Sequence, residues 1–134
     1  MIALVACDDG VYVVDVEEDR LAERLPGETL EPRPRPGELV PSFALSHLVD
    51  CDAAGSAVVL LLDRRPPLLV SHDGGETWSE RGGGLPSGRG IALGENPDHV
   101  LYGARNRLYV STNGGVFWRA LTVEVPEIRA VAWG

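Results

Sequence analysis

The chain has 134 residues, of which 44% are apolar, and its formal net charge is −8. This length fits one small domain, and the negative charge argues against non-specific binding to nucleic acid or anionic membranes, which needs a cationic surface. No apolar run approaches the roughly 20 residues that span a bilayer, and the first residues lack the basic stretch of a secretory signal. We therefore expect no nucleic-acid or membrane partner and a cytoplasmic location.

The N-terminal part is predicted to form three short strands followed by a long loop. The strands lie at residues 1–7, 11–16 and 21–25, and Asp8-Asp9-Gly10 forms the turn between the first two. Residues 26–41 are a proline-rich insert, for which we predict a semi-extended surface loop, with a peptide-like docking arm as the alternative.

The rest of the chain is predicted to hold two sets of four strands and one final strand. The first set comprises residues 48–52, 57–62, 67–71 and 77–80, the second comprises residues 90–94, 99–103, 107–111 and 117–121, and the final strand covers residues 128–133. The continuous apolar run at residues 58–62 is typical of a strand that is covered on both faces of its sheet.

One segment occurs twice with a spacing of 40 residues (111 − 71), since Ser71-His72-Asp73-Gly74-Gly75-Glu76-Thr77-Trp78 returns as Ser111-Thr112-Asn113-Gly114-Gly115-Val116-Phe117-Trp118. This period is typical of four-stranded propeller blades. The first copy resembles the Asp-box (BNR) signature S-x-D-x-G-x-T-W, which sialidases and many non-enzymatic β-propellers carry. The second copy departs from it, because Asn113 replaces the Asp and Phe117 replaces the Thr.

The repeated residues have a structural explanation. An Asp or Asn side chain can accept hydrogen bonds from N–H groups of its own turn, glycine reaches positive φ without strain, and tryptophan supplies a large apolar surface. We therefore predict a folding role, and no catalytic one, for the box residues Ser71, Asp73, Gly75, Thr77, Trp78, Ser111, Asn113, Gly115 and Trp118.

The resemblance implies an all-β fold made of β-propeller blades, with three four-stranded blades in the chain. Blade 1 covers about residues 1–25 and is completed by residues 127–134, blade 2 covers residues 42–81, and blade 3 covers residues 88–121. The final strand matches the innermost strand of blade 3, because Arg129 follows Arg89 by 40 residues (129 − 89), and blade 1 lacks such a strand of its own.

Three blades are fewer than the four to eight with which propellers usually close. We therefore predict a homodimer in which two chains form a six-bladed ring and each chain donates residues 128–133 to the first blade of the other. The alternatives are that the chain is a piece of a longer propeller, or that it closes on itself in a compact form.

The ligand face is predicted from the same resemblance, because propellers usually hold ligands on loops that join the outer strand to the next inner strand and the second strand to the third. Seven arginines fall in these loops, namely Arg33, Arg35, Arg64, Arg65, Arg89, Arg105 and Arg107. The blade alignment also puts His47, Arg89 and Arg129 at the mouth of the inner strands.

A guanidinium is a fixed fork of donors that matches carboxylate or phosphate. We therefore predict a candidate anion site formed by His47, Arg89, Arg129, Arg64, Arg65, Arg105 and Arg107. The alternative is that these arginines pair with Asp63, Glu124 and Glu127 and only keep the loops soluble.

No catalytic set is evident. A sialidase-like glycosidase needs an arginine cluster, a tyrosine nucleophile with an acidic partner and a separate acid. The pattern places no acid beside Tyr12, Tyr102 or Tyr109. A glycosidase with a pair of carboxylates would need two acids near the propeller axis, for which Asp50 is the best candidate and Asp52 and Glu95 are the others. The three histidines and the two cysteines have no metal-binding spacing.

The sequence therefore predicts a non-catalytic binding or scaffold protein without metal or cofactor. Its loop face would serve a protein partner or an anionic or glycan ligand, and a glycoside hydrolase of the Asp-box class is the alternative.

Overall fold

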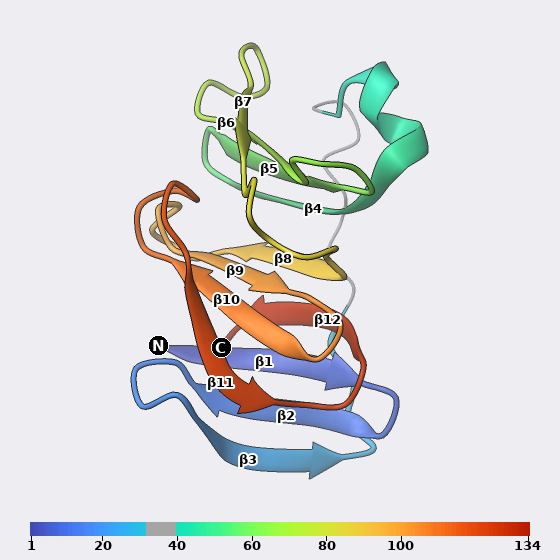
Figure 1. Cartoon of the computed structure of the whole chain (residues 1–134), viewed down its shortest axis with the longest axis vertical. Coiled ribbons are helices and arrows are strands. Elements are labelled where there is room, and N and C mark those ends of the chain that lie inside the picture. Colours follow the sequence, from blue (N-terminus) through green and yellow to red (C-terminus); the bar gives the residue numbers. More distant parts are fainter. Residues whose placement is uncertain (32–39) are drawn as a thin grey trace.

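The fold, taken from a computed structural model that describes residues 1–31 and 40–134 without the side chains of Phe43 and Leu45, is all-β. Figure 1 shows its strands, which form three four-stranded antiparallel sheets. Sheet 1 has the order β12 (Ile128–Trp133), β1 (Ile2–Cys7), β2 (Gly10–Asp15) and β3 (Arg20–Pro26). Sheet 2 contains β4 (Leu48–Ala54), β5 (Ala57–Leu62), β6 (Leu68–Ser71) and β7 (Ser79–Arg81). Sheet 3 contains β8 (Gly90–Leu93), β9 (Val100–Gly103), β10 (Arg107–Ser111) and β11 (Arg119–Glu124), and the short 3₁₀ helix η1 (Ser42–His47) precedes β4.

The C-terminal strand completes the first sheet, as predicted, but it does so within its own chain. β12 pairs antiparallel with β1 in a register that places Val5 opposite Val131. The exchange of this strand between two chains is therefore not needed to complete sheet 1, and it stays a prediction. The physical reason for the pairing within one chain is the packing of sheet 3 on sheet 1, because the short connection from β11 to β12 then brings β12 beside β1 of the same chain.

Sheet 3 lies between the two other sheets (Figure 1), and its inner strand β8 contacts both β4 and β12. One apolar cluster joins sheet 3 to sheet 1 and includes Leu101 and Val5, both fully buried. A second joins sheet 3 to sheet 2 and includes Tyr102 and Leu61. The alternation of the two faces along β9 therefore puts Leu101 and Tyr102 into different cores, which is the period-2 rule of strands.

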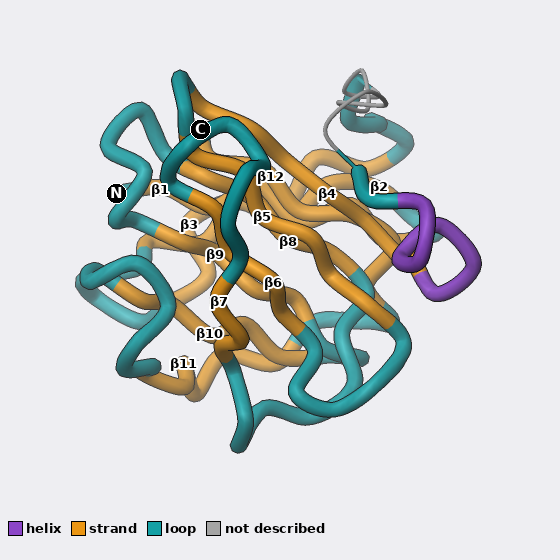
Figure 2. The backbone as a smooth tube through the Cα atoms, turned by 90° about the horizontal axis from the view of Figure 1, so that it is seen from above, coloured by secondary structure: helices purple, strands orange, loops and turns teal. Residues whose placement is uncertain are grey.

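The outer faces of the stack differ. The far face of sheet 2 is covered, since Val58 and Leu60 pack there against Val40 and Ala44. These two residues belong to the segment at residues 40–47, whose 3₁₀ helix η1 lies at the margin of the strand layers (Figure 2). On the far face of sheet 1, by contrast, Leu4 is only half-buried although its neighbours Ala3 and Val5 are fully buried against sheet 3. Sheet 1 therefore has one face with an incomplete cover.

A carboxylate joins the outer strands of sheets 1 and 3. Asp19 has a positive φ of 51°, and its side chain accepts hydrogen bonds from the Thr122 N–H at 2.9 Å, the Thr122 hydroxyl at 2.9 Å and the Val123 N–H at 3.2 Å. These bonds, led by the one from the Thr122 N–H, lower the pKa of Asp19. The acidic turn at residues 17–19 is thus part of the contact between two sheets.

Candidate functional site

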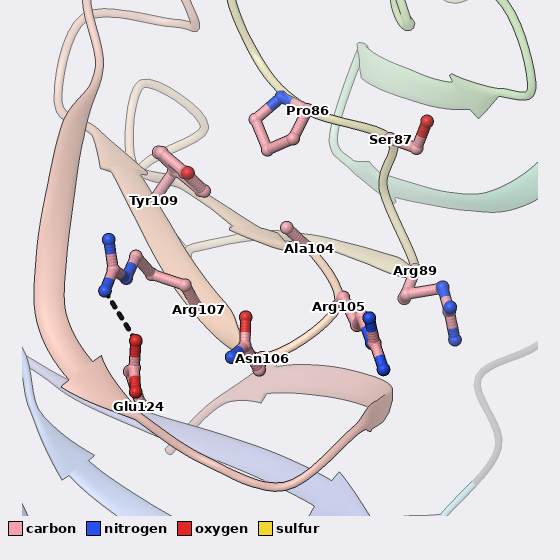
Figure 3. Close-up of a pocket in the computed structure, with 9 residues that line it drawn as sticks. All are labelled: Pro86, Ser87, Arg89, Ala104, Arg105, Asn106, Arg107, Tyr109 and Glu124. Carbon is pink, nitrogen blue, oxygen red and sulfur yellow. Dashed lines mark hydrogen bonds and ion pairs between the residues drawn. The ribbon is translucent and has the colours of Figure 1, made fainter.

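Three arginines line one hollow of about 490 Å³ on the loop side of sheet 3. Figure 3 shows Arg89 and Arg105 at one end of it and Arg107 at the other, with Asn106 between them. The wall is completed by the side chains Pro86, Ser87, Ala104, Tyr109 and Glu124. The lining holds three arginines and one acid, Glu124, so it is more cationic than the chain as a whole, whose net charge is −8.

The backbone holds these arginines in place through the turn between β9 and β10. The Ala104 N–H donates to the Arg107 carbonyl at 2.9 Å, and the Arg89 N–H donates to the Gly103 carbonyl at 2.7 Å. Gly103 must be glycine, since a Cβ there would lie 2.8 Å from Cγ1 of Val131. The close approach of β9 to β12 therefore fixes the turn that carries Arg105.

Tyr102 holds the opposite side of the hollow. Its ring is fully buried, and its hydroxyl donates to the Pro86 carbonyl at 2.6 Å. Gly88 has to be small beside it, because a Cβ there would lie 2.6 Å from the Tyr102 hydroxyl oxygen. Burial raises the pKa of Tyr102, so that the hydroxyl stays protonated and keeps this hydrogen bond.

The arginines of the hollow have different partners. Arg107 Nη2 lies 2.8 Å from Glu124 Oε1, and Arg89 Nη1 lies 2.9 Å from Glu127 Oε1. The Arg105 guanidinium, in contrast, has no hydrogen bond or ion pair with the residues that the structure describes. The alternative to an anion site, in which these arginines pair with nearby acids, thus holds for Arg107 with Glu124 and for Arg89 with Glu127, but not for Arg105 among the described residues.

Arg129 lies outside the hollow but belongs to the same charge network. It donates to both oxygens of Asp8, from Nε at 2.9 Å and from Nη2 at 3.1 Å, and its Nη2 is 3.6 Å from Glu127 Oε2. Arg89 and Arg129 therefore share one carboxylate.

The other members of the predicted anion site do not line this hollow. His47 ends η1, and among the described residues it has no hydrogen bond or ion pair with Arg89 or Arg129. Arg64 pairs with Glu80 at 3.3 Å, and Arg65 donates to the Leu85 carbonyl at 3.2 Å, on the loops of sheet 2. Arg33 and Arg35 lie outside the described residues.

The structure corrects the expectation that no acid lies beside a tyrosine, and it shows what the Asp50 carboxylate binds. An acid does lie beside one tyrosine, since the Tyr12 hydroxyl donates to Asp9 Oδ2 at 2.8 Å and Arg24 pairs with the same carboxylate at 3.0 Å. The pattern missed it because Asp9 is in the turn and reaches back to the strand. The best axial carboxylate, Asp50, accepts a hydrogen bond from the Ile91 N–H at 3.0 Å, and so it joins the inner strands of sheets 2 and 3.

The first box turn is built around a serine and an aspartate. The Gly75 N–H donates to Ser71 Oγ at 2.8 Å, and the Ser71 hydroxyl donates to Asp73 Oδ1 at 2.8 Å. Asp73 also accepts bonds from the Glu76 N–H and from the N–H and hydroxyl of Thr77. These bonds, led by the Thr77 hydroxyl, lower the pKa of Asp73 to about 2.

The second box turn repeats this arrangement with an amide. The Gly115 N–H donates to Ser111 Oγ at 2.9 Å, the Ser111 hydroxyl donates to Asn113 Oδ1 at 2.9 Å, and the Phe117 N–H donates to Asn113 Oδ1 at 3.0 Å. Phe117 and Thr77 lie in these turns, and β7 and β11 begin only at Ser79 and Arg119, two residues later than predicted.

Sequence reasoning missed several residues at the hollow, above all Asn106, Tyr109 and Pro86. Tyr109 alternates with buried residues along β10, so a period-2 reading of that strand offered a signal for its position. No comparable signal exists for Asn106 or Pro86, whose positions depend on loop conformation.

The described residues contain no group of three or more His, Cys, Asp or Glu side chains that is arranged to hold a metal ion. Both cysteines are buried free thiols. Neither described range includes a helix that is long and apolar enough to cross a membrane.

Fold and site together define the chain as a three-sheet all-β protein with an arginine-lined hollow on its loop side. No model of a known protein family matches the sequence, and a comparison with curated proteins finds no match either.

Proposed function

We propose that the chain is a non-catalytic binding protein of the β-propeller type, and that the hollow lined by Arg89, Arg105 and Arg107 binds an anionic ligand, in the first place an acidic sugar. The observation that carries the proposal is the gathering of these three arginines in one hollow of a chain with net charge −8. A guanidinium binds a carboxylate through two parallel hydrogen bonds, and Tyr109 and Pro86 add apolar wall on which a sugar ring can lie.

The test is a calorimetric titration with glucuronate at low salt. Arg105→Ala should abolish measurable binding, because Arg105 has no competing acid partner among the described residues, whereas Arg20→Ala, an exposed arginine on β3, should leave binding unchanged. Absence of binding by the unsubstituted protein to a panel of acidic sugars would overturn the proposal. Retention of one specific protein in a pulldown, with no response to these sugars, would favour a protein-binding scaffold.

A glycoside hydrolase is the second candidate, and one observation favours it. Tyr12 and Asp9 form a hydrogen-bonded pair of the kind that a tyrosine nucleophile requires, and Arg24 lies beside them. The hydrogen bond to Asp9 raises the pKa of Tyr12. A fluorogenic glycoside of an acidic sugar tests this candidate, since Tyr12→Phe should abolish turnover, and no turnover by the unsubstituted protein would exclude it.

We also infer that the three sheets are blades of a propeller which two chains complete as a six-bladed homodimer. Ala132 on the far face of sheet 1 follows Ala92 by 40 residues (132 − 92), and Ala92 is buried where sheet 3 packs on sheet 1. The far face of sheet 1 would accordingly receive the next blade, supplied by a second copy. Since β12 already pairs with β1 of its own chain, the ring does not require the strand exchange.

Ring closure has a cost that the dimer must offset. The matching face of sheet 2 is covered by Val40 and Ala44, so the segment at residues 40–47 would have to move away. Light scattering tests the ring directly. A mass of twice the chain mass of 14.4 kDa, lost in Leu4→Arg and kept in Leu21→Arg on the exposed outer strand, would support it, whereas a monomer at high concentration would overturn it.

A further inference from the structure

Glu127 lies between Arg89 and Arg129 at the edge of the hollow. Its Oε1 is 2.9 Å from Arg89 Nη1, and its Oε2 is 3.6 Å from Arg129 Nη2. The hydrogen bond from Arg89, and then the charges of Arg129 and Arg105, hold the pKa of Glu127 below its ordinary value. One carboxylate of the chain thus occupies the place where the guanidinium groups of Arg89 and Arg129 can meet a carboxylate of a ligand.

The backbone around Glu127 is fixed, although its side chain is exposed. The Ile128 N–H donates to the Arg105 carbonyl at 2.7 Å, and the Val125 N–H donates to the Asn106 carbonyl at 3.0 Å. The Cys7 thiol donates to the Pro126 carbonyl at 3.4 Å. The segment between β11 and β12 is therefore tied to the turn that carries Arg105, while the Glu127 carboxylate, whose side chain is 43% exposed, can turn out to solvent.

The arginines would stay in position if Glu127 turned away. Arg129 is held by its two hydrogen bonds to Asp8, and Arg105 has no hydrogen bond or ion pair in the described part of the chain. Arg89 would lose its hydrogen-bond partner, and Arg129 would lose only its longer contact of 3.6 Å. Ion pairs between exposed side chains are weak, so the exchange of one carboxylate for another at Arg89 costs little.

We propose that Glu127 is an internal substitute for the ligand, whose carboxylate displaces that of Glu127 from Arg89 and also reaches the guanidinium of Arg105, which is unpaired among the described residues. This inference rests on the proposed anion-binding function and specifies it, because the group that is replaced is a planar carboxylate. The ligand class is accordingly a small acid with a free carboxylate, such as a sugar acid. Glu127 lowers the apparent affinity for every such ligand by the same factor, since each ligand must compete with this tethered group.

The test compares glucuronate binding by the unsubstituted protein, Glu127→Gln and Glu80→Gln in calorimetric titrations at constant ionic strength. Glu127→Gln should bind roughly three- to tenfold more tightly, because it removes the competing charge. Glu80→Gln makes the same change of net charge at the pair with Arg64 on sheet 2, and it should bind as the unsubstituted protein does. Equal affinities of all three proteins, or an equal gain in both variants, would overturn the inference.

A second measurement needs no substitution at Glu127. In the unsubstituted protein, the ¹³C carboxyl resonance of Glu127 should titrate with a lowered pKa, and saturating glucuronate should return that pKa to its ordinary value or above. An unchanged titration in the presence of bound ligand would overturn the displacement while leaving the anion site itself intact. If no protein form binds glucuronate or a related acid, the proposed function fails, and this inference fails with it.

Discussion

The two box turns reach the same backbone shape with different chemistry. In both, a serine hydroxyl that is 1% exposed accepts a hydrogen bond from a glycine N–H, at Ser71 in one turn and at Ser111 in the other. The paired glycines have nearly the same φ, 73° and 94° in the first turn and 73° and 91° in the second. Each turn also docks on the neighbouring hairpin through its first glycine, which donates to the carbonyl of residue 56 or residue 98 at 2.9 Å.

The two turns differ in the third residue of the box, which is Asp73 in the first turn and Asn113 in the second. Asp73 accepts bonds from two N–H groups and a hydroxyl beyond its serine, whereas Asn113 accepts one N–H bond beyond its serine, from Phe117. The turn therefore requires an oxygen acceptor at this position and does not require a charge. The carboxylate adds bonds to Thr77 that the second turn, with Phe117 in the matching place, does not make.

The largest effect is expected when the serine of either turn is removed. Ser111→Ala should cost roughly 1–3 kcal/mol of the free energy of unfolding, because it leaves the buried Gly115 N–H without its acceptor. Ser71→Ala should cost less, since Asp73 keeps its bonds to Thr77 and still closes the turn. Urea unfolding of both variants measures which one loses more free energy of unfolding. A larger loss for Ser71→Ala would show that the extra bonds of Asp73 do not support the turn.

Much of the architecture could be predicted from the sequence, because it depends on local pattern. Alternation and continuous apolar runs located the strands, and the spacing of 40 residues placed residues 128–133 beside the first strand. That this pairing forms within one chain could not be derived, since periodicity gives the partner strand but not the chain that supplies it. The cover of sheet 2 by Val40 and Ala44 carries no periodic signal at all.

The site was predictable only in part, for a related reason. The sequence locates an arginine in a loop, but the position of its guanidinium depends on four side-chain torsions and on nearby acids. Arg107 and Glu124 lie on paired strands, so their contact follows from register. His47 had the same predicted alignment as Arg89, yet it does not line the hollow, because the chain before β4 forms a 3₁₀ helix and the chain before β8 does not.

A smaller, pH-dependent effect is expected for Asp73→Asn, which gives the first turn the acceptor of the second. The pKa of Asp73 is about 2 in the folded chain, below its ordinary value of 3.8. Its charged form therefore adds stability that is fully present above about pH 4 and is lost as the pH falls through 2. Asp73→Asn should destabilise slightly at pH 7, less than Ser71→Ala, and the difference from the unsubstituted protein should shrink between pH 4 and pH 2.

Thermal unfolding between pH 5 and pH 2 measures how the stability difference between Asp73→Asn and the unsubstituted protein changes with pH. Asn113→Asp is the matched variant, because it should introduce into the second turn the acid sensitivity that Asp73→Asn removes from the first. A difference between Asp73→Asn and the unsubstituted protein that stays constant from pH 5 to pH 2 would contradict a lowered pKa at Asp73.

The smallest effect is expected at Phe117, whose side chain is 76% exposed. Phe117→Thr should change the free energy of unfolding by no more than about 0.5 kcal/mol, because little contact is lost and Asn113 is a weaker acceptor for the new hydroxyl than a carboxylate. Combined with Asn113→Asp, however, the same substitution recreates the hydroxyl–carboxylate bond that Thr77 makes with Asp73. A double-mutant cycle by urea unfolding at pH 7 should therefore give a coupling of about 0.5–1 kcal/mol in favour of the double variant. Strict additivity would mean that the Thr–Asp bond of the first turn forms without stabilising it, and that the two turns are equivalent in energy as well as in shape.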